Sequence, residues 1–274
     1  MKQKTVTNQI CARGIGRDSN KVVHITIKPA LENVGIVFRR VDLDTPIEIP
    51  ASVDNARVED GQLVFTCNGY RVGNTEHLLA ACYGAGVHNL YIEIDGDELP
   101  KMTESASAYV FLLQSAGIKE QEATRAQIKI DEPQLFRRNK GWIRATSFEG
   151  LRVGCVNTLT ENSVSVQRSS SVVDITEAVF VSELCYAQPG AGSPGSESGI
   201  NKTATKNKRQ LIQRSQLNHM VVEVMAYLFL TDADVDGCYT SFDADVSLHL
   251  DAIRAMKDLS IKEFQFATKR YGHA

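Results

Sequence analysis

Two residues that can bind a metal ion stand one helical turn apart in an apolar segment. His219 and Glu223 are four positions apart, and most residues between 217 and 230 are aliphatic or aromatic. On a helix, positions i and i+4 share a face. A helix that is apolar all round is buried, and a buried carboxylate needs a cation or a hydrogen-bond donor. A divalent metal would meet that need, and so would a plain hydrogen bond between the two side chains.

Glu76 and His77 form a second pair, at the start of a helix for which Asn74 is the predicted cap. Neighbouring side chains on a helix point about 100° apart, so these two can flank one cavity. A zinc hydrolase uses three protein ligands and a nearby carboxylate that takes the proton of the attacking water. His77, His219 and Glu223 would be the ligands and Glu76 the base. The ordinary alternative for Glu76 is an acidic residue that the helix dipole stabilises and keeps ionised.

Composition excludes several classes of protein. The 274 residues carry 30 Lys and Arg against 33 Asp and Glu, a formal charge of −3, which argues against a nucleic-acid-binding protein. No apolar run is long enough for a transmembrane helix, and the N-terminus has no apolar signal segment, so we expect a cytoplasmic protein. None of the six cysteines forms a Cys-x-x-Cys pair. They are expected to be reduced core residues and not zinc ligands.

The elements that must hold these residues follow an α+β pattern that occurs twice. In the first half we predict strands at 22–27, 35–38, 63–67 and 90–94 and helices at 74–84 and 105–116. In the second half we predict strands at 127–130, 141–146, 151–155 and 239–242 and helices at 176–184, 210–230 and 248–256. The polar segment 119–125 is predicted as a linker, which places two domains at 1–122 and 123–274. The segment 188–209, rich in Gly, Ser, Pro and Lys, is predicted as a long loop.

Three segments, in this order, resemble the zinc-dependent UDP-3-O-acyl-N-acetylglucosamine deacetylases of lipid A synthesis. They are Gly14-Ile15-Gly16 with the strand end Ile27-Lys28-Pro29-Ala30, then Thr75-Glu76-His77-Leu78, then His219 with Glu223. The resemblance implies two two-layer α+β domains of the ribosomal-S5-domain-2-like kind with the metal between them. It also implies Zn²⁺, with Fe²⁺ as an alternative, and an N-acyl amino sugar or UDP-sugar as substrate.

The chain departs from the family at several positions that the resemblance makes functional. Met220 stands where the family has a lysine, Tyr227 where it has an aspartate that orients a histidine, and Val246 where it has that histidine, a general acid. His249 is the candidate replacement for this acid. Cys185 and Tyr186 lie at the family's Thr-Phe pair and are the candidate substrate-binding residues.

Two functions therefore stay open. The first is a zinc-dependent deacetylase. Because the polar segment 188–209 lacks the aliphatic residues of an acyl-chain passage, we expect this enzyme to act poorly on substrates with a long acyl chain. The second is a metal-binding relative with impaired catalysis that binds a sugar nucleotide or a protein partner. The three replaced residues favour the second function, and the retained Glu76 favours the first.

Overall fold

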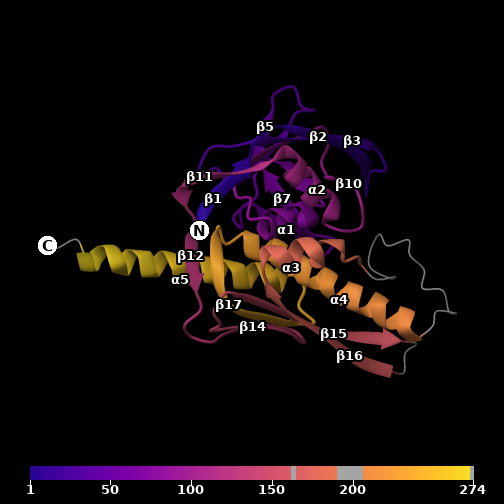
Figure 1. Ribbon diagram of the computed structural model, residues 1–274, viewed down its shortest axis with the longest axis vertical. Helices are drawn as coiled ribbons and strands as arrows, with labels where there is room; N and C mark the ends of the chain where they lie inside the picture. Colours follow the sequence, from indigo (N-terminus) through magenta and orange to yellow (C-terminus); the bar gives the residue numbers. More distant parts are fainter. Residues whose placement is uncertain (162–164, 190–205, 272–274) are drawn as a thin grey trace.

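The first half of the chain is built on a six-stranded sheet, in the upper part of Figure 1. The structure is a computed structural model that describes residues 1–161, 165–189 and 206–271. The sheet has the order β10-β2-β3-β9-β4-β5, with bounds β2 Ile10–Gly16, β3 Val22–Pro29, β4 Ile36–Arg40, β5 Ile47–Pro50, β9 Leu90–Ile94 and β10 Pro100–Lys101. The same half contains a three-stranded sheet and two helices: β6 Ala56–Glu59, β7 Gln62–Cys67, β8 Tyr70–Gly73, α1 Glu76–Gly84 and α2 Ser107–Ala116.

The strand β3 illustrates why this sheet forms. Val23, Ile25 and Ile27 are buried, whereas Val22 and His24, which alternate with them, are exposed. A period of two places every second side chain in the core. The structure confirms the strands predicted at 22–27, 35–38, 63–67 and 90–94, the second of which begins at Ile36. It also contains β2, β5, β6, β8 and β10, which the sequence did not predict.

The second half has a six-stranded sheet of its own. The order is β13-β14-β17-β15-β16, and β12 pairs with β17 in parallel. Its elements are β12 Ala126–Lys129, β13 Gln134–Arg138, β14 Gly141–Thr146, β15 Leu151–Glu161, β16 Ser165–Ile175, α3 Glu177–Ser182, the 3₁₀ turn η1 Leu184–Tyr186, α4 Lys206–Phe229, β17 Ala233–Phe242 and α5 Val246–Tyr271. The predicted strands at 127–130, 141–146, 151–155 and 239–242 are confirmed.

Helices from both halves meet in the middle of the molecule. In Figure 1, α1 lies directly above α3 and α4, and the two sheets lie outside them. The approach is closest at Gly84, where a Cβ atom would collide with the ring of Phe180 on α3. Because α1 packs so tightly against the second half, its first residues are brought close to α4.

The polar segment 119–125 is not a linker, contrary to the prediction. Residues Ile118–Thr124 form β11, which pairs antiparallel with β1 (Lys2–Val6). The backbone N–H of Arg125 then donates to the carbonyl of Met1, and Ala126 begins β12. The chain therefore passes from the first half to the second within a continuous extended segment.

Three helices differ from the prediction at one or both of their ends. Asn74 is not the cap of α1: it has a φ of 56°, and Thr75 precedes the helix without a side-chain cap bond. The helix α4 begins at Lys206, and residues 190–205 of the predicted loop 188–209 lie outside the described residues. The helix α5 starts at Val246 and continues to Tyr271, well beyond 248–256. Within the part of the chain that is described, no helix has both the length and the apolar character to span a bilayer.

All six cysteines are free thiols, as predicted. Cys82, Cys155 and Cys185 are buried and pack as small core residues. Cys11 is exposed, so the expectation of a core position is wrong for this residue.

A buried histidine ties β1 to the connection between α1 and β9. The Nδ1 atom of His88 accepts a hydrogen bond of 2.9 Å from the backbone N–H of Lys4, and the residue is 5% exposed. Burial lowers the pKa of His88 to about 3, and the positive charges of Arg125, Lys4 and the N-terminal amine act in the same direction. The imidazole is therefore neutral in the folded protein at neutral and mildly acidic pH.

This residue makes stability depend on pH. Since the pKa of His88 is lower in the folded than in the unfolded chain, the unfolded chain binds the proton first, and stability falls as the pH drops below about 6.5. We expect His88→Asn, which keeps an acceptor for Lys4, to reduce the loss of unfolding free energy between pH 7 and pH 5 by about 2 kcal/mol. Urea unfolding at both pH values measures this. His24→Asn, at an exposed position, is the control, and an unchanged loss in His88→Asn would contradict the prediction.

Candidate functional site

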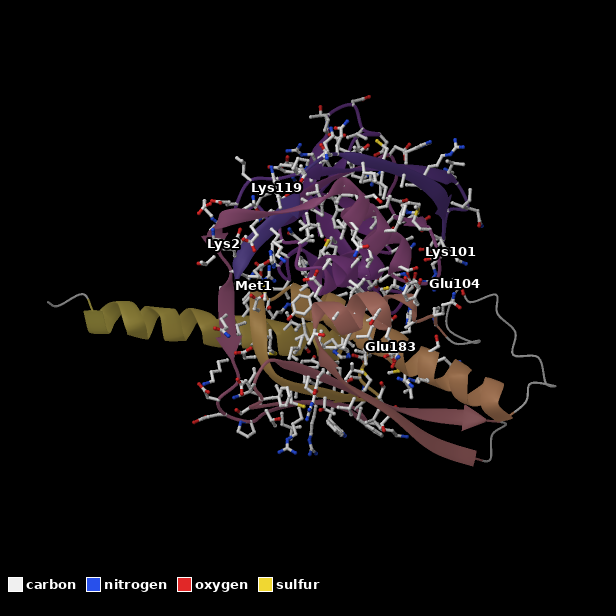
Figure 2. All side chains as sticks on the ribbon, in the orientation of Figure 1. Met1, Lys2, Lys101, Glu104, Lys119 and Glu183 are labelled. Atoms are coloured by element: carbon white, nitrogen blue, oxygen red, sulfur yellow. The ribbon has the colours of Figure 1, made fainter. Side chains whose placement is uncertain are left out.

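One cavity collects the chemically active residues that the sequence singled out. It has a volume of about 610 Å³ and is lined by residues of both halves, among them Glu76 and His77 from α1, His219 and Glu223 from α4, and His249 from α5. Lys101 and Glu104 also line it, and Figure 2 shows both at the level where the two halves meet. The cavity therefore lies where α1 of the first half faces α4 and α5 of the second.

The two histidines converge inside the cavity. The Nε2 atoms of His77 and His219 are 2.9 Å apart, and their rings meet edge to face with centroids 5.1 Å apart. They come from residues 142 positions apart in the chain, and the packing of α1 on α4 brings them together. The structure thus brings together two of the residues that the sequence singled out as candidate metal ligands.

Both imidazoles are neutral at physiological pH. Burial lowers the pKa of His77 to about 3, and the charge of His219 adds to this effect. Burial lowers the pKa of His219 to about 4, and the positive charge of Arg17 contributes. A neutral imidazole has a free lone pair, which is the form that binds a metal ion.

The carboxylate of Glu76 lies beside the pair and holds a proton more readily than the sequence suggests. One of its oxygens accepts a long hydrogen bond of 3.3 Å from the backbone N–H of Leu63. The helix-dipole argument predicts a carboxylate that stays ionised, but burial dominates and raises the pKa of Glu76 to about 7. The negative charge of Glu223 raises it further. A carboxyl group with such a pKa can both accept and return a proton near neutral pH.

Glu223 lies on the other side of the His219 ring. Its Oε1 atom is 3.7 Å from Nδ1 of His219, and its side chain is 41% accessible from the cavity. Burial raises its pKa to about 7 as well, against the charge of Arg17. The spacing of four residues therefore places the two side chains on one face of α4, as predicted.

The donor types in the cavity fit a zinc ion, which binds neutral imidazoles and carboxylates. Two of the three predicted ligands, His77 and His219, already point their Nε2 atoms at each other. Within residues 1–161, 165–189 and 206–271, however, no three His, Cys, Asp or Glu side chains are grouped as a metal site. The third ligand, Glu223, is thus close to the pair without completing it.

Aromatic and apolar residues occupy the cavity wall beyond Glu223. Tyr227 is buried, and the centroid of its ring lies 4.9 Å from the centroid of the His249 ring. Val246 is the first residue of α5, and the preceding Asp245 accepts a hydrogen bond of 2.7 Å from the backbone N–H of Leu248. Asp245 therefore caps the helix.

His249 lies in the cavity wall but carries no spare proton. Its Nδ1 atom is 3.0 Å from the hydroxyl of Tyr239, and its ring packs between Tyr227 and Tyr239. Burial lowers the pKa of His249 to about 4. At neutral pH it is an uncharged hydrogen-bonding residue, which is a poor starting point for a general acid.

Cys185 and Tyr186 lie away from the cavity. Cys185 is 1% exposed and its thiol donates to the carbonyl of Val181 in α3. Tyr186 is 63% exposed. Neither belongs to the described residues that line the cavity.

Several charged residues that line the cavity were not predicted from the sequence. Arg17 follows the Gly14-Ile15-Gly16 segment and reaches it from the end of β2, and Lys101 and Glu104 form an ion pair of 3.0 Å. Arg17 could have been found from the sequence as a charged residue that directly follows the segment Gly14-Ile15-Gly16. Nothing in the spacing of Lys101 and Glu104 indicates a place near the histidines.

Comparison with known proteins places the sequence in a family. The sequence profile described as "LpxC: UDP-3-O-acyl N-acetylglycosamine deacetylase" matches residues 3–190, which include Glu76 and His77. His219 and Glu223 lie beyond this match.

Individual relatives extend the similarity to most of the chain. The UDP-3-O-acyl-N-acetylglucosamine deacetylase of Thioalkalivibrio sulfidiphilus is 32% identical over 275 aligned residues, which cover 93% of this chain and 90% of that protein. The protein of the same name from Xanthomonas campestris pv. campestris is 29% identical over 93% of this chain and 89% of its own length. The one from Nitrosococcus oceani is 36% identical over 188 residues, 69% of this chain and 62% of that protein. The chain belongs to the LpxC family of UDP-3-O-acyl-N-acetylglycosamine deacetylases.

Proposed function

We propose that this protein is a zinc-dependent deacetylase that removes the N-acyl group of a UDP-linked amino sugar in lipid A biosynthesis. The observation that carries the proposal is the convergence of two neutral histidines, 2.9 Å apart, beside the carboxyl group of Glu76 in one cavity. Family membership supplies the reaction, because the relatives that cover most of this chain are named for it.

In this proposal His77, His219 and Glu223 hold the metal ion, Zn²⁺ or alternatively Fe²⁺. When bound, the ion polarises the amide carbonyl and makes water a better nucleophile. Imidazole nitrogen and carboxylate oxygen suit both metals. The depressed pKa values of the two histidines support the role, since both lone pairs are free without the release of a proton.

Glu76 moves the protons. Its carboxylate accepts a proton from the attacking water and returns it to the amide nitrogen as the bond between this nitrogen and the acyl carbon breaks, so that the acyl group departs as a carboxylate and the amine stays on the sugar. With a pKa near 7 one carboxyl group can serve both steps. His249, whose pKa is near 4, is uncharged and supplies no proton at neutral pH.

The proposal includes the finer architecture of the family. Residues 1–122 and 123–274 would each form a two-layer domain of the ribosomal-S5-domain-2-like kind, with the metal between them. In support, each half has its own six-stranded sheet and the cavity is lined from both. Since β11 continues to Thr124, the change of domain falls close to Arg125.

Measurement of amine release tests the function and the acyl-chain preference together. Zinc-loaded protein is given UDP-3-O-acyl-N-acetylglucosamine with either a short or a long 3-O-acyl chain. We expect turnover of the short-chain substrate and little or none of the long-chain one, because residues 188–209 are too polar to form an apolar passage.

Two results would contradict parts of this proposal. Rates on the long-chain substrate equal to those of the Thioalkalivibrio sulfidiphilus relative would show the chain-length expectation to be wrong. No amine release from either substrate, with zinc fully bound, would favour a relative that binds sugar nucleotides without hydrolysing them.

A further inference from the structure

An arginine that has no hydrogen-bond or ion-pair partner among the described residues lines the cavity. Arg17 lies directly after β2 and lines the cavity wall. Among the described residues, its guanidinium forms no hydrogen bond and no ion pair, although guanidinium groups carry five N–H donors. The other cation in the wall, Lys101, is already paired with Glu104. Arg17 is thus a cation whose donors are available to whatever enters the cavity.

The turn that carries Arg17 is held by a buried carboxylate. Glu98 is 2% exposed and accepts hydrogen bonds from the backbone N–H groups of Asp18 (3.0 Å) and Ser19 (2.8 Å). Its second oxygen also accepts a bond of 2.5 Å from the side-chain amide of Asn74. Because Asn74 stands two residues before Glu76, this carboxylate ties the Arg17 turn to the start of α1.

A glycine makes room for this carboxylate. A Cβ atom on Gly16 would collide with Oε1 of Glu98 and with the hydroxyl of Ser19. The turn and Glu98 therefore fit together only because residue 16 has no side chain. Such a close fit fixes the backbone on both sides of Arg17.

The charges around Arg17 indicate what it faces. Glu76 and Glu223 lie in the same cavity, and Arg17 acts on both carboxylates and on both histidines. Arg17 therefore lines the same cavity as the four groups on which its charge acts. Its planar fork suits an anionic oxygen, whether this belongs to a phosphate or develops on a carbonyl group.

We propose that Arg17 binds an anionic oxygen of the substrate, and that Glu98 is the positioning residue that holds the turn carrying Arg17. The role rests on the proposed deacetylase function. Two oxygens share this chemistry: the amide oxygen, which becomes negative as water attacks, and the phosphate oxygens of a UDP-sugar. The nearness of Arg17 to the histidine pair favours the amide oxygen.

Steady-state kinetics test the role of Arg17. The variants are Arg17→Gln and Arg17→Lys, with Arg13→Gln as the control. Arg13 lies on β2, the strand that precedes Arg17; it is exposed and is not among the described residues that line the cavity. The substrates are UDP-3-O-acetyl-N-acetylglucosamine and an N-acetylglucosamine derivative without phosphate. We expect Arg17→Gln to lower kcat/KM by about 10²-fold and Arg17→Lys to recover part of this loss.

The two substrates separate the two oxygens. A fall in kcat on both substrates identifies the amide oxygen, whereas a rise in KM confined to the UDP-sugar identifies a phosphate. Values for Arg17→Gln that match Arg13→Gln on both substrates would overturn the proposal.

Glu98→Gln tests the positioning role. We expect it to change the same kinetic parameter as Arg17→Gln, by a smaller factor, and to add nothing in the double variant Arg17→Gln/Glu98→Gln. A merely structural role would lower the melting temperature and multiply the kinetic losses in the double variant. That result would overturn the assignment of Glu98.

Binding measurements keep the proposal testable if the parent protein releases no amine. Calorimetric titration of the metal-free protein with acetate and with UDP needs no turnover. We expect Arg17→Gln to weaken the binding of at least one of them by about 10-fold or more. If the parent and Arg17→Gln bind both equally, or the parent binds neither, Arg17 is not an anion-binding residue. If the protein binds these anions but has no deacetylase activity, the difference in affinity between the parent and Arg17→Gln remains.

Discussion

Replacing Glu76 with glutamine is expected to lower kcat by about 10²- to 10⁴-fold without loss of bound zinc. Glutamine has the same shape but cannot take a proton from water. It retains a carbonyl oxygen that can accept the hydrogen bond from the N–H of Leu63, so the start of α1 should keep its structure. The effect should therefore appear in the chemical step and not in stability or metal content.

Steady-state amine release, zinc content and thermal unfolding together check this expectation. Glu48→Gln is a matched control because it removes an exposed carboxylate, on β5, whose partner is Arg39. A kcat for Glu76→Gln within about twofold of that of Glu48→Gln would show that another group takes the proton, since loss of a general base costs far more.

The parts of the fold that sequence predicts best are those where burial repeats with a fixed period. The strand β3 alternates buried and exposed residues, and the apolar segment around Val221 and Val224 forms the buried part of α4. The strand β11 escaped prediction because few of its side chains are apolar. Its pairing with β1 relies on backbone hydrogen bonds, which any sequence can make, so its polar residues resembled a linker.

The site shows the same division between local and distant causes. His219 and Glu223 share a face because of their spacing, which the sequence displays directly. Arg17 could not be placed in this way, because its position depends on Glu98, about 80 residues further along the chain. The pKa of Glu76 could not be predicted either, because the helix dipole is a local effect, whereas the burial that overrides it depends on the tertiary structure.

Removal of the imidazole in His219→Ala is expected to reduce zinc from about one ion per chain to almost none. His219 is the residue whose Nε2 atom meets that of His77, so without it a single imidazole and one carboxylate are left. Three protein ligands are the usual minimum for a catalytic zinc ion. Metal analysis of dialysed protein measures the loss, and His24→Ala, at an exposed histidine paired with Asp95, is the control. Full zinc content in His219→Ala would refute the ligand assignment.

A Glu223→Gln variant then decides how the carboxylate takes part. In the structure Glu223 faces Nδ1 of His219 at 3.7 Å, on the ring atom that does not point at His77. If Glu223 turns to become the third ligand, Glu223→Gln should lose most of its zinc, as His219→Ala does. If it stays beside Nδ1 and only orients the imidazole, the variant should still bind one zinc ion, with affinity about 10- to 100-fold weaker. A zinc affinity equal to that of the parent protein would exclude both roles, because a ligand and an orienting carboxylate each contribute to metal binding.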